Sequence, residues 1–347
     1  MDWSCASVAG ALPASGSHEL LKMAPFMSTR SPIITVPGDD PPQLQGSPHL
    51  ERLGAYGEVR LYTDRPETVA EKVRRARDAV CLINSRGSVH WPGEVLRQLP
   101  RLEMISLCGI GTDSIDRDAA KELGIVVCKI PGRTAPIVAE HAIALMLAVG
   151  RRAWWHTDRV KRGVWAGRDM VFLRGKMLGV VGAGPIGVET ARLGLALGMR
   201  VQAWTFHPSP ERSAKLGVPF VCLEELLRTS DVVSLHVPLT EQTRRLIGPR
   251  ELSCMKPGAI LVNTARGAIV DNRVLAAALD AGRLCGAGID VFEEEPVPPD
   301  HPLVRCDQVV LTPHAADQTP EGMDILNGGA VDNVIAFLEG RPQNRVV

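Results

Sequence analysis

The sequence predicts an α/β protein with two domains, each built on a parallel sheet that helices cover on both faces. Its 347 residues exceed what one hydrophobic core usually serves. From Ile33 onward, short apolar runs alternate with stretches of helical spacing, which is typical of parallel sheets. A glycine-rich turn beginning at Gly182 follows the first apolar run of the second half. These features exclude a coiled coil and a mainly disordered chain.

The first half contains five apolar runs of strand length and two stretches of helical spacing. Because these patterns alternate along the chain, they favour strands lying parallel within one sheet. The candidate strands span residues 33–36, 59–62, 79–83, 104–107 and 125–127, and the candidate helices span 68–76 and 93–99.

The second half repeats the alternation with six candidate strands, enough for a complete doubly wound sheet. They span residues 177–181, 200–204, 232–236, 259–263, 286–291 and 309–312. A nearly all-apolar helix is expected over 134–149, and such a helix must be buried. The last helical pattern, about 321–338, is too short to form a domain and is expected to pack on the first half.

The glycine-rich turn is Gly182-Ala-Gly184-Pro-Ile-Gly187, placed between a strand and a helix. In this arrangement the first glycine permits a tight turn, the second lets a pyrophosphate approach the backbone, and the third lets helix and strand pack closely. The helix N-terminus offers free N–H groups to the anion. The motif therefore predicts a Rossmann-like domain that binds a dinucleotide.

These features divide the chain into a substrate domain and a nucleotide domain inserted into it. The joint lies near residues 129–133. We expect a discontinuous substrate domain over 31–132 and 315–347, an NAD(P)-binding domain over 133–314, and a disordered tail over 1–30, which is a mixture of Ser, Ala, Pro and Gly.

Composition and charge exclude several classes of partner. Lys plus Arg and Asp plus Glu both number 39, so no overall field attracts nucleic acid or an acidic membrane. The longest apolar stretch, 137–149, is too short to span a bilayer. The eight cysteines form no C-x-x-C pair, which favours a reducing compartment over disulfides or zinc. We expect a cytoplasmic protein without a metal site.

The choice of cofactor is left open by the end of the second strand of the nucleotide domain. An acid there would bind the ribose hydroxyls of NAD and repel the extra phosphate of NADP. Thr205 occupies this position, and His207 or Arg212 could meet a phosphate. NAD(H) and NADP(H) are therefore both expected as cofactors.

Polar motifs also lie where the later strands should end, at the edge where open α/β sheets bind ligands. They are His236-Val-Pro238, Asn263-Thr-Ala-Arg266-Gly267, Asp290 through Glu295-Pro296, and Thr312-Pro-His314. In this order, with Gly182-x-Gly-x-x-Gly187, they resemble the D-isomer-specific 2-hydroxyacid dehydrogenase family over nearly the whole chain beyond the tail. The resemblance implies reversible reduction of a small 2-oxo acid to a D-2-hydroxy acid with NAD(P)H.

By matched motif, Arg266, Glu295 and His314 correspond to the family's catalytic arginine, acid and histidine. Hydride transfer to a 2-oxo acid places negative charge on the carbonyl oxygen, and histidine suits proton donation there near neutral pH. A neighbouring carboxylate favours the protonated ring and orients it. Arginine can clamp the substrate carboxylate with its planar fork. Taken singly, the three residues could also be a core histidine, a surface cation and a solvated acid.

The resemblance implies further contacts in both domains. Asp290 is expected to accept from the nicotinamide carboxamide. Arg86 and Gly87 are expected to contact the substrate together with Arg266, although a surface role for Arg86 is equally open. The expected cofactor contacts are Gly182, Gly184, Pro185, Ile186, Gly187, Thr205, Val237, Pro238, Thr243, Thr264, Ala265, Arg266 and Asp290.

Two alternatives to this activity remain at this point. One is a formate- or phosphite-type dehydrogenase of the same fold, and the other is a non-catalytic protein that senses nicotinamide nucleotides. A silent sensor has no need of the catalytic trio, which favours an enzyme.

Trp154, Trp155 and Trp165 lie close together beside arginines, a composition typical of interface cores. The resemblance also implies dimerisation through this segment, as in other members of the family. Together, the composition and the resemblance predict a two-fold homodimer.

Overall fold

The structure, a computed structural model, describes residues 31–347. The tail expected over residues 1–30 lies outside the described residues. The chain divides into two compact units. Ala135–Gln318 forms the central unit, and residues 31–134 with Thr319–Val347 form the flanking unit. The boundaries between the two units fall after residues 134 and 318.

The flanking unit contains a five-stranded parallel sheet in the order β2-β1-β3-β4-β5. All five strands predicted for the first half are present, with bounds that shift by no more than a few residues. They are β1 (Ile33–Val36), β2 (Glu58–Leu61), β3 (Cys81–Ser85), β4 (Met104–Cys108) and β5 (Val126–Cys128).

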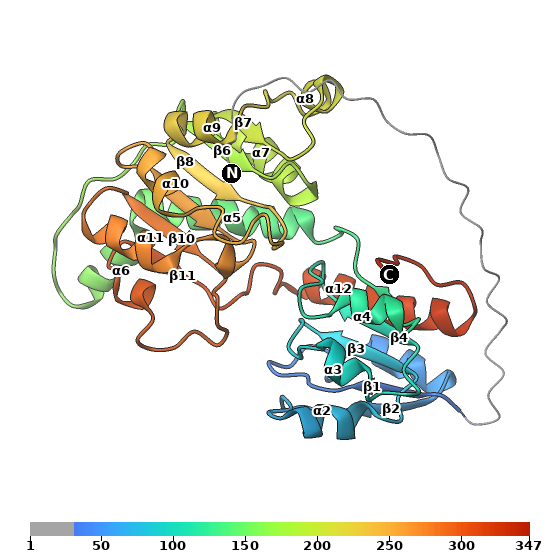
Figure 1. Ribbon diagram of the computed structural model, residues 1–347. Helices are drawn as coiled ribbons and strands as arrows, with labels where there is room; N and C mark the ends of the chain where they lie inside the picture. The colour runs from blue at the N-terminus through green and yellow to red at the C-terminus, as the bar shows by residue number, and fades with distance from the viewer. Residues whose placement is uncertain (1–30) are drawn as a thin grey trace. The chain divides into compact units, whose positions relative to one another are not determined.

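Helices cover both faces of this sheet because successive strand side chains point to opposite faces. In β3, Leu82 joins the cluster beneath α2 (Val69–Ala76), α3 (Gly93–Leu96) and α4 (Arg117–Glu122). Its neighbour Ile83 joins the cluster beneath α12 (Pro320–Leu338). The C-terminal helix α12 thus packs on the first-half strands, as expected, and Figure 1 shows its red ribbon beside the cyan β4. A short α1 (Pro48–Glu51) and a 3₁₀ turn, η1 (Arg52–Ala55), complete the unit.

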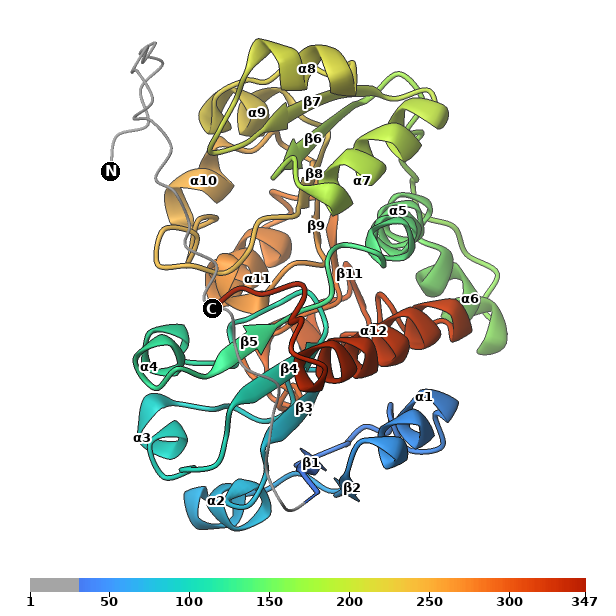
Figure 2. The same ribbon diagram turned by 90° about the vertical axis from the view of Figure 1, so that its right-hand side faces the viewer.

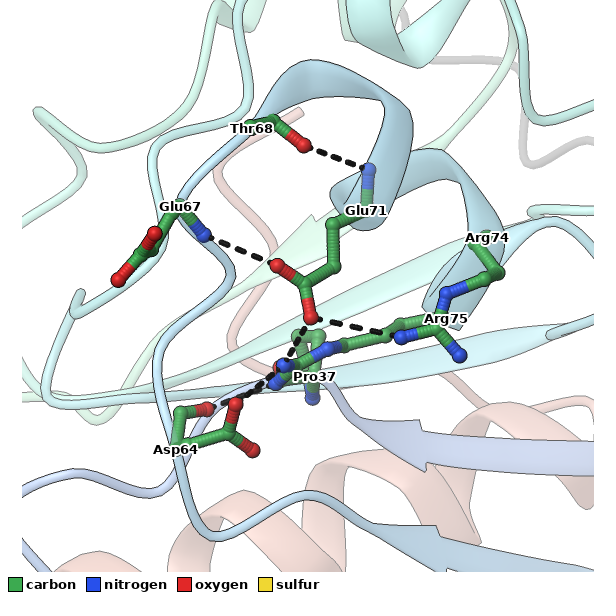
Figure 3. Close-up of polar contacts among 7 residues, drawn as sticks. All are labelled: Pro37, Asp64, Glu67, Thr68, Glu71, Arg74 and Arg75. Atoms are coloured by element: carbon green, nitrogen blue, oxygen red, sulfur yellow. Dashed lines mark hydrogen bonds and ion pairs between the residues drawn. The ribbon is translucent and has the colours of Figure 1, made fainter.

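The guanidinium of Arg75 is buried in the flanking unit. The Arg75 side chain is only 2% exposed, and its guanidinium contacts the carboxylates of Asp64 and Glu71 at 2.5 Å each (Figure 3). It also donates to the backbone oxygens of Pro37 at 2.9 Å and Asp64 at 2.7 Å. The hydrogen bonds from Arg75 lower the pKa of both carboxyl groups. Arg75 therefore ties α2 to the chain that follows β1.

The central unit contains a six-stranded parallel sheet in the order β11-β10-β9-β8-β6-β7. A parallel bridge between Phe220 and Ala203 adds a rudimentary strand beyond β7, which the sequence does not predict. The six predicted strands are present as β6 (Met177–Val181), β7 (Arg200–Trp204), β8 (Val232–Leu235), β9 (Ile260–Asn263), β10 (Gly286–Ile289) and β11 (Val309–Leu311).

The expected apolar helix, α5 (Ala135–Arg151), packs with α7 (Pro185–Ala196) on one face of the sheet. On the other face lie α9 (Leu223–Thr229), α10 (Pro249–Cys254) and α11 (Asn272–Asp280) (Figure 2). Gly288 lets α5 approach closely, since a Cβ there would lie 2.8 Å from the Leu145 Cβ. The shorter α6 (Ala153–Lys161), α8 (Pro210–Leu216), η2 (Gly267–Ile269) and η3 (Pro302–Arg305) complete the unit. Within residues 31–347, no helix is long and apolar enough to cross a bilayer.

Candidate active site

The glycine-rich turn of the central unit has the geometry that a bound pyrophosphate requires. Gly182 has φ +105°, and a Cβ there would lie 2.7 Å from the backbone of His236. A Cβ at Gly187 would lie 1.9 Å from the Gly182 oxygen, so only glycine lets α7 pack on the turn. Gly184 has open space around its missing side chain and precedes the first turn of α7. Backbone N–H groups can approach an anion at this point.

The end of β7 lies beside this turn, because the Gly182 amide donates to the Trp204 oxygen at 2.8 Å. Thr205 directly follows the strand, at the position predicted for the ribose contact. Arg212 donates to the backbone oxygen of Ala183 at 3.0 Å and to that of His207. The neutral Thr205 and the guanidinium of Arg212, which is bonded to the backbone, therefore lie where an acidic side chain would repel the ribose phosphate of NADP.

His314 and Glu295 form the centre of the candidate active site. The His314 Nδ1 lies 2.7 Å from the Glu295 Oε2, and both side chains are about one-third exposed. The other carboxylate oxygen of Glu295 accepts the Phe292 amide at 2.9 Å. Burial alone would raise the pKa of Glu295, but the bonds from His314 and Phe292 and the charges of His314 and Arg266 together lower it. The contact with Glu295 thus fixes the orientation of the ring through Nδ1.

Asp290 holds the backbone that carries His314. This backbone has φ +50° at His314, an uncommon conformation for a residue with a side chain. The His314 amide donates to the Asp290 oxygen at 2.7 Å, and the next two amides, Ala315 and Ala316, donate to its carboxylate at 2.8 and 3.2 Å. Burial would raise the pKa of Asp290, but bonds from His141, Thr312 and Ala315 lower it. Because this carboxylate is fully buried among partners of its own chain, its contact with the nicotinamide stays a prediction.

Arg266 lies on the loop after β9, and this loop touches the loop that bears Glu295. The contact depends on Gly267, where a Cβ would lie 2.0 Å from the Phe292 backbone carbon. The Arg266 guanidinium donates to the Ala265 oxygen at 2.7 Å, and Asn263 donates to the Arg266 oxygen at 2.9 Å. The structure therefore brings the three predicted catalytic residues together within the central unit.

The remaining predicted cofactor residues line the same ends of the strands. The Thr264 hydroxyl is buried without a hydrogen-bond partner, which suits a ligand contact. Thr243 is fully buried and donates to the Pro238 oxygen at 2.6 Å, so it shapes the loop after β8. Val237 and Ala265 flank these residues in the chain. The open space at Gly184 and the unpaired hydroxyl of Thr264 are both features that suit a dinucleotide, so the residues present fit this cofactor.

Arg86 and Gly87 belong to the flanking unit, where they form the turn at the end of β3. Both have positive φ, +51° and +66°. The Ser88 amide donates to the Ser85 oxygen at 2.8 Å, which closes the turn.

Among residues 31–347, no cluster of three or more candidate ligands could hold a metal ion.

Sequence reasoning missed His141 on α5. Its Nε2 lies 3.0 Å from the Thr312 hydroxyl and 3.4 Å from the Asp290 carboxylate. His141 therefore supports Asp290, which in turn holds the backbone at His314. A signal was present, because His141 interrupts an otherwise apolar helix whose buried side faces the sheet. A polar residue at such a position needs a partner.

Comparison with known proteins gives this geometry a family. Residues 143–316 match the D-isomer specific 2-hydroxyacid dehydrogenase, NAD binding domain. The chain is 41% identical to a glyoxylate reductase of Aeropyrum pernix, over 86% of this chain and 92% of that protein. It is 38% identical to a D-3-phosphoglycerate dehydrogenase of Archaeoglobus fulgidus, over 86% of this chain and 56% of that one. An acyclic imino acid reductase solved with NADPH and D-Arg superposes with a TM-score of 0.81 at 26% identity, covering 91% of this chain and all of that one.

The chain belongs to the D-isomer-specific 2-hydroxyacid dehydrogenase family. It is an NAD(P)-dependent oxidoreductase that interconverts 2-oxo acids and D-2-hydroxy acids.

Proposed function

We propose that the chain reduces a small 2-oxo acid, of the size of glyoxylate or hydroxypyruvate, at a site built around Arg266, Glu295 and His314. The observation that carries the proposal is the 2.7 Å contact between His314 and Glu295. A histidine held by a carboxylate on one nitrogen can present a proton on the other. The name of the Aeropyrum relative, a glyoxylate reductase, supports a substrate of this size.

The chain's own residues would prepare the carbonyl group for reduction. Arg266 would bind the substrate carboxylate and polarise the neighbouring carbonyl. His314 would donate a proton from Nε2 to the carbonyl oxygen while Glu295 stabilises the ring. Arg86 and Gly87 are proposed as further substrate contacts. Bound NAD(P)H, held by the Gly182–Gly187 turn, would supply the hydride.

The test is steady-state turnover of glyoxylate, hydroxypyruvate and pyruvate with NADH and with NADPH. We expect at least one of these acids to be reduced at a rate that depends on enzyme concentration. If none of the three acids is reduced but formate or phosphite is oxidised, the result would favour a formate- or phosphite-type dehydrogenase. Cofactor binding without turnover of any substrate would favour a sensor.

We also propose that the protein is a homodimer in the reducing cytoplasm. An apolar patch over residues 160–172 supports the dimer, since Trp165 is 94% and Phe172 69% exposed. Exposed apolar clusters of this kind mark interaction sites. The cysteines within the described residues form no disulfide, which suits the compartment. Light scattering of the wild type should give a mass of about twice the 37.4 kDa of one chain. The double variant Trp165→Ser, Phe172→Ser should give a lower mass. A wild-type mass of one chain would refute the dimer.

A further inference from the structure

The turn that carries Arg86 and Gly87 has a backbone conformation that must be held in place. Arg86 has φ +51°, in the left-handed region that costs energy for a residue with a side chain. Such conformations persist where the surroundings fix them, and they gather at functional sites. The groups that hold this turn are therefore informative about its role.

A buried carboxylate, that of Asp39, contacts the turn directly. Asp39 is fully buried and accepts the Ser85 hydroxyl at 2.7 Å. The same carboxylate accepts three backbone amides of its own loop, from Gln43 at 3.1 Å, Leu44 at 2.9 Å and Gln45 at 2.7 Å. No ion pair within residues 31–347 involves Asp39. The carboxylate of Asp39 accepts from four donors and joins the loop after β1 to the turn after β3.

The residues around Asp39 are fixed from two further directions. The Ser88 hydroxyl, at the far end of the turn, donates to the Gly38 oxygen at 3.0 Å. The buried Arg75 donates to the Pro37 oxygen (Figure 3). Because three consecutive residues after β1 are held by side chains from elsewhere in the unit, Asp39 is a rigid support for Ser85.

The position of this link in the sheet points to a ligand. In the order β2-β1-β3-β4-β5, the connections leave β1 and β3 toward opposite sides, so the switch point lies between these two strands. Ligands of open α/β sheets bind outside the carboxyl ends of the strands at the switch point. Asp39 follows the end of β1, and Ser85 is the last residue of β3.

We propose that Asp39, acting through the Ser85 hydroxyl, is a positioning residue for the 2-oxo acid, because it fixes the Arg86–Gly87 turn in the shape that binds the substrate. This inference rests on the proposed function. It assigns Asp39 no contact with the substrate and no part in proton transfer. Its effect should therefore fall on the KM of the 2-oxo acid rather than on kcat.

The experiment compares two serine variants that lose the same buried group. Ser85→Ala removes the link to Asp39 but leaves the three amide bonds of Asp39 intact. The control is Ser106→Ala on the neighbouring strand β4, whose hydroxyl is also buried and donates to the Ala330 oxygen at 2.9 Å. We measure KM and kcat for the best 2-oxo acid, the Kd of NAD(P)H and the melting temperature of each variant.

Ser85→Ala should raise the KM of the 2-oxo acid by about tenfold, the effect of losing one hydrogen bond to a charged group, with kcat and the Kd of NAD(P)H nearly unchanged. Ser106→Ala should leave all three constants near wild type at a similar melting temperature. Equal KM values in the two variants would overturn the proposal. A wild type that reduces no 2-oxo acid would instead overturn the proposed function, and this inference with it.

Discussion

Two acidic residues hold His314 at different points: Glu295 holds the ring, and Asp290 holds the backbone at His314 and at the two residues that follow it. Glu295 contacts the ring at 2.7 Å, and Asp290 accepts hydrogen bonds from the backbone at and after His314. The sequence motifs predict the residue types at this site, because proton donation and carboxylate binding need these side chains. They do not predict that Asp290 would bond backbone amides or that His141 would support it, since both contacts depend on how α5 packs on the sheet.

Replacing His314 by Ala should lower kcat by about 10²–10⁴, the usual contribution of a positioned acid or base. The Kd of NAD(P)H should stay within about twofold, because His314 belongs to none of the expected cofactor contacts. A matched control is His49→Ala, which removes another histidine lying 2.7 Å from a carboxylate, that of Asp324. Turnover that falls equally in the two variants, or in neither, would refute the role of His314.

Glu295 predicts a dependence of stability on pH. Its pKa is lowered in the folded protein, so its ionised form is favoured by folding. This contribution is fully present above its ordinary pKa of 4.5 and is lost as pH falls through the lower folded value. The melting temperature of wild type should exceed that of Glu295→Gln at pH 6, and the gap should narrow below about pH 4. A gap that widens in acid would contradict this account.

Thr205 predicts tolerance of NADPH, because no acid follows β7 to repel the ribose phosphate. Thr205→Asp should shift the ratio of kcat/KM for NADPH to that for NADH toward NADH by about tenfold or more, since like charges placed together are unfavourable. The control is Ser209→Asp, which adds the same charge four residues further on, at the N-cap of α8. If wild type already excludes NADPH as strongly as the Thr205 variant, Thr205 does not set the choice.

Strands were more predictable than helices in both units. Parallel strands that helices cover on both faces are continuous apolar runs, and each of the predicted runs is a strand of the structure. Short helices such as α1, α4 and α8 were not predicted, because four to seven residues give little periodicity. The rudimentary strand at Phe220 is held by two backbone bonds with Ala203, which no side-chain pattern reveals.

The glycine-rich turn at the start of α7 allows a test that separates binding from folding. A Cβ at Gly184 would meet no heavy atom within 4 Å, and its φ of −80° suits alanine. Gly184→Ala should therefore melt near wild type yet raise the Kd of NAD(P)H by about tenfold or more, because the methyl group occupies the approach of the pyrophosphate. The control is Gly54→Ala, also in open space, which should leave the Kd unchanged. Unaltered affinity in the Gly184 variant would exclude this turn as the pyrophosphate site.

At the scale of the whole molecule, the two units share one design. Each sheet runs from its second strand through its first to its third, fourth and fifth, and each places polar groups at the carboxyl ends around the switch point. The sequence predicts both sheets because alternating patterns recur on either side of residue 134. It does not predict which side chains within each unit fix the loops, because contacts such as Asp39 with Ser85 join residues far apart in the chain.

The chirality of the product tests the central claim most directly. Wild type should reduce hydroxypyruvate with NADH or NADPH to D-glycerate alone. Arg266 and His314 would hold the acid in one orientation, so that one face of the carbonyl receives the hydride, and the family of the chain is specific for the D isomer. Chromatography on a chiral column, with His314→Ala as the blank, measures the two enantiomers. Formation of L-glycerate or of a racemate, or the same trace of product in both proteins, would contradict the account.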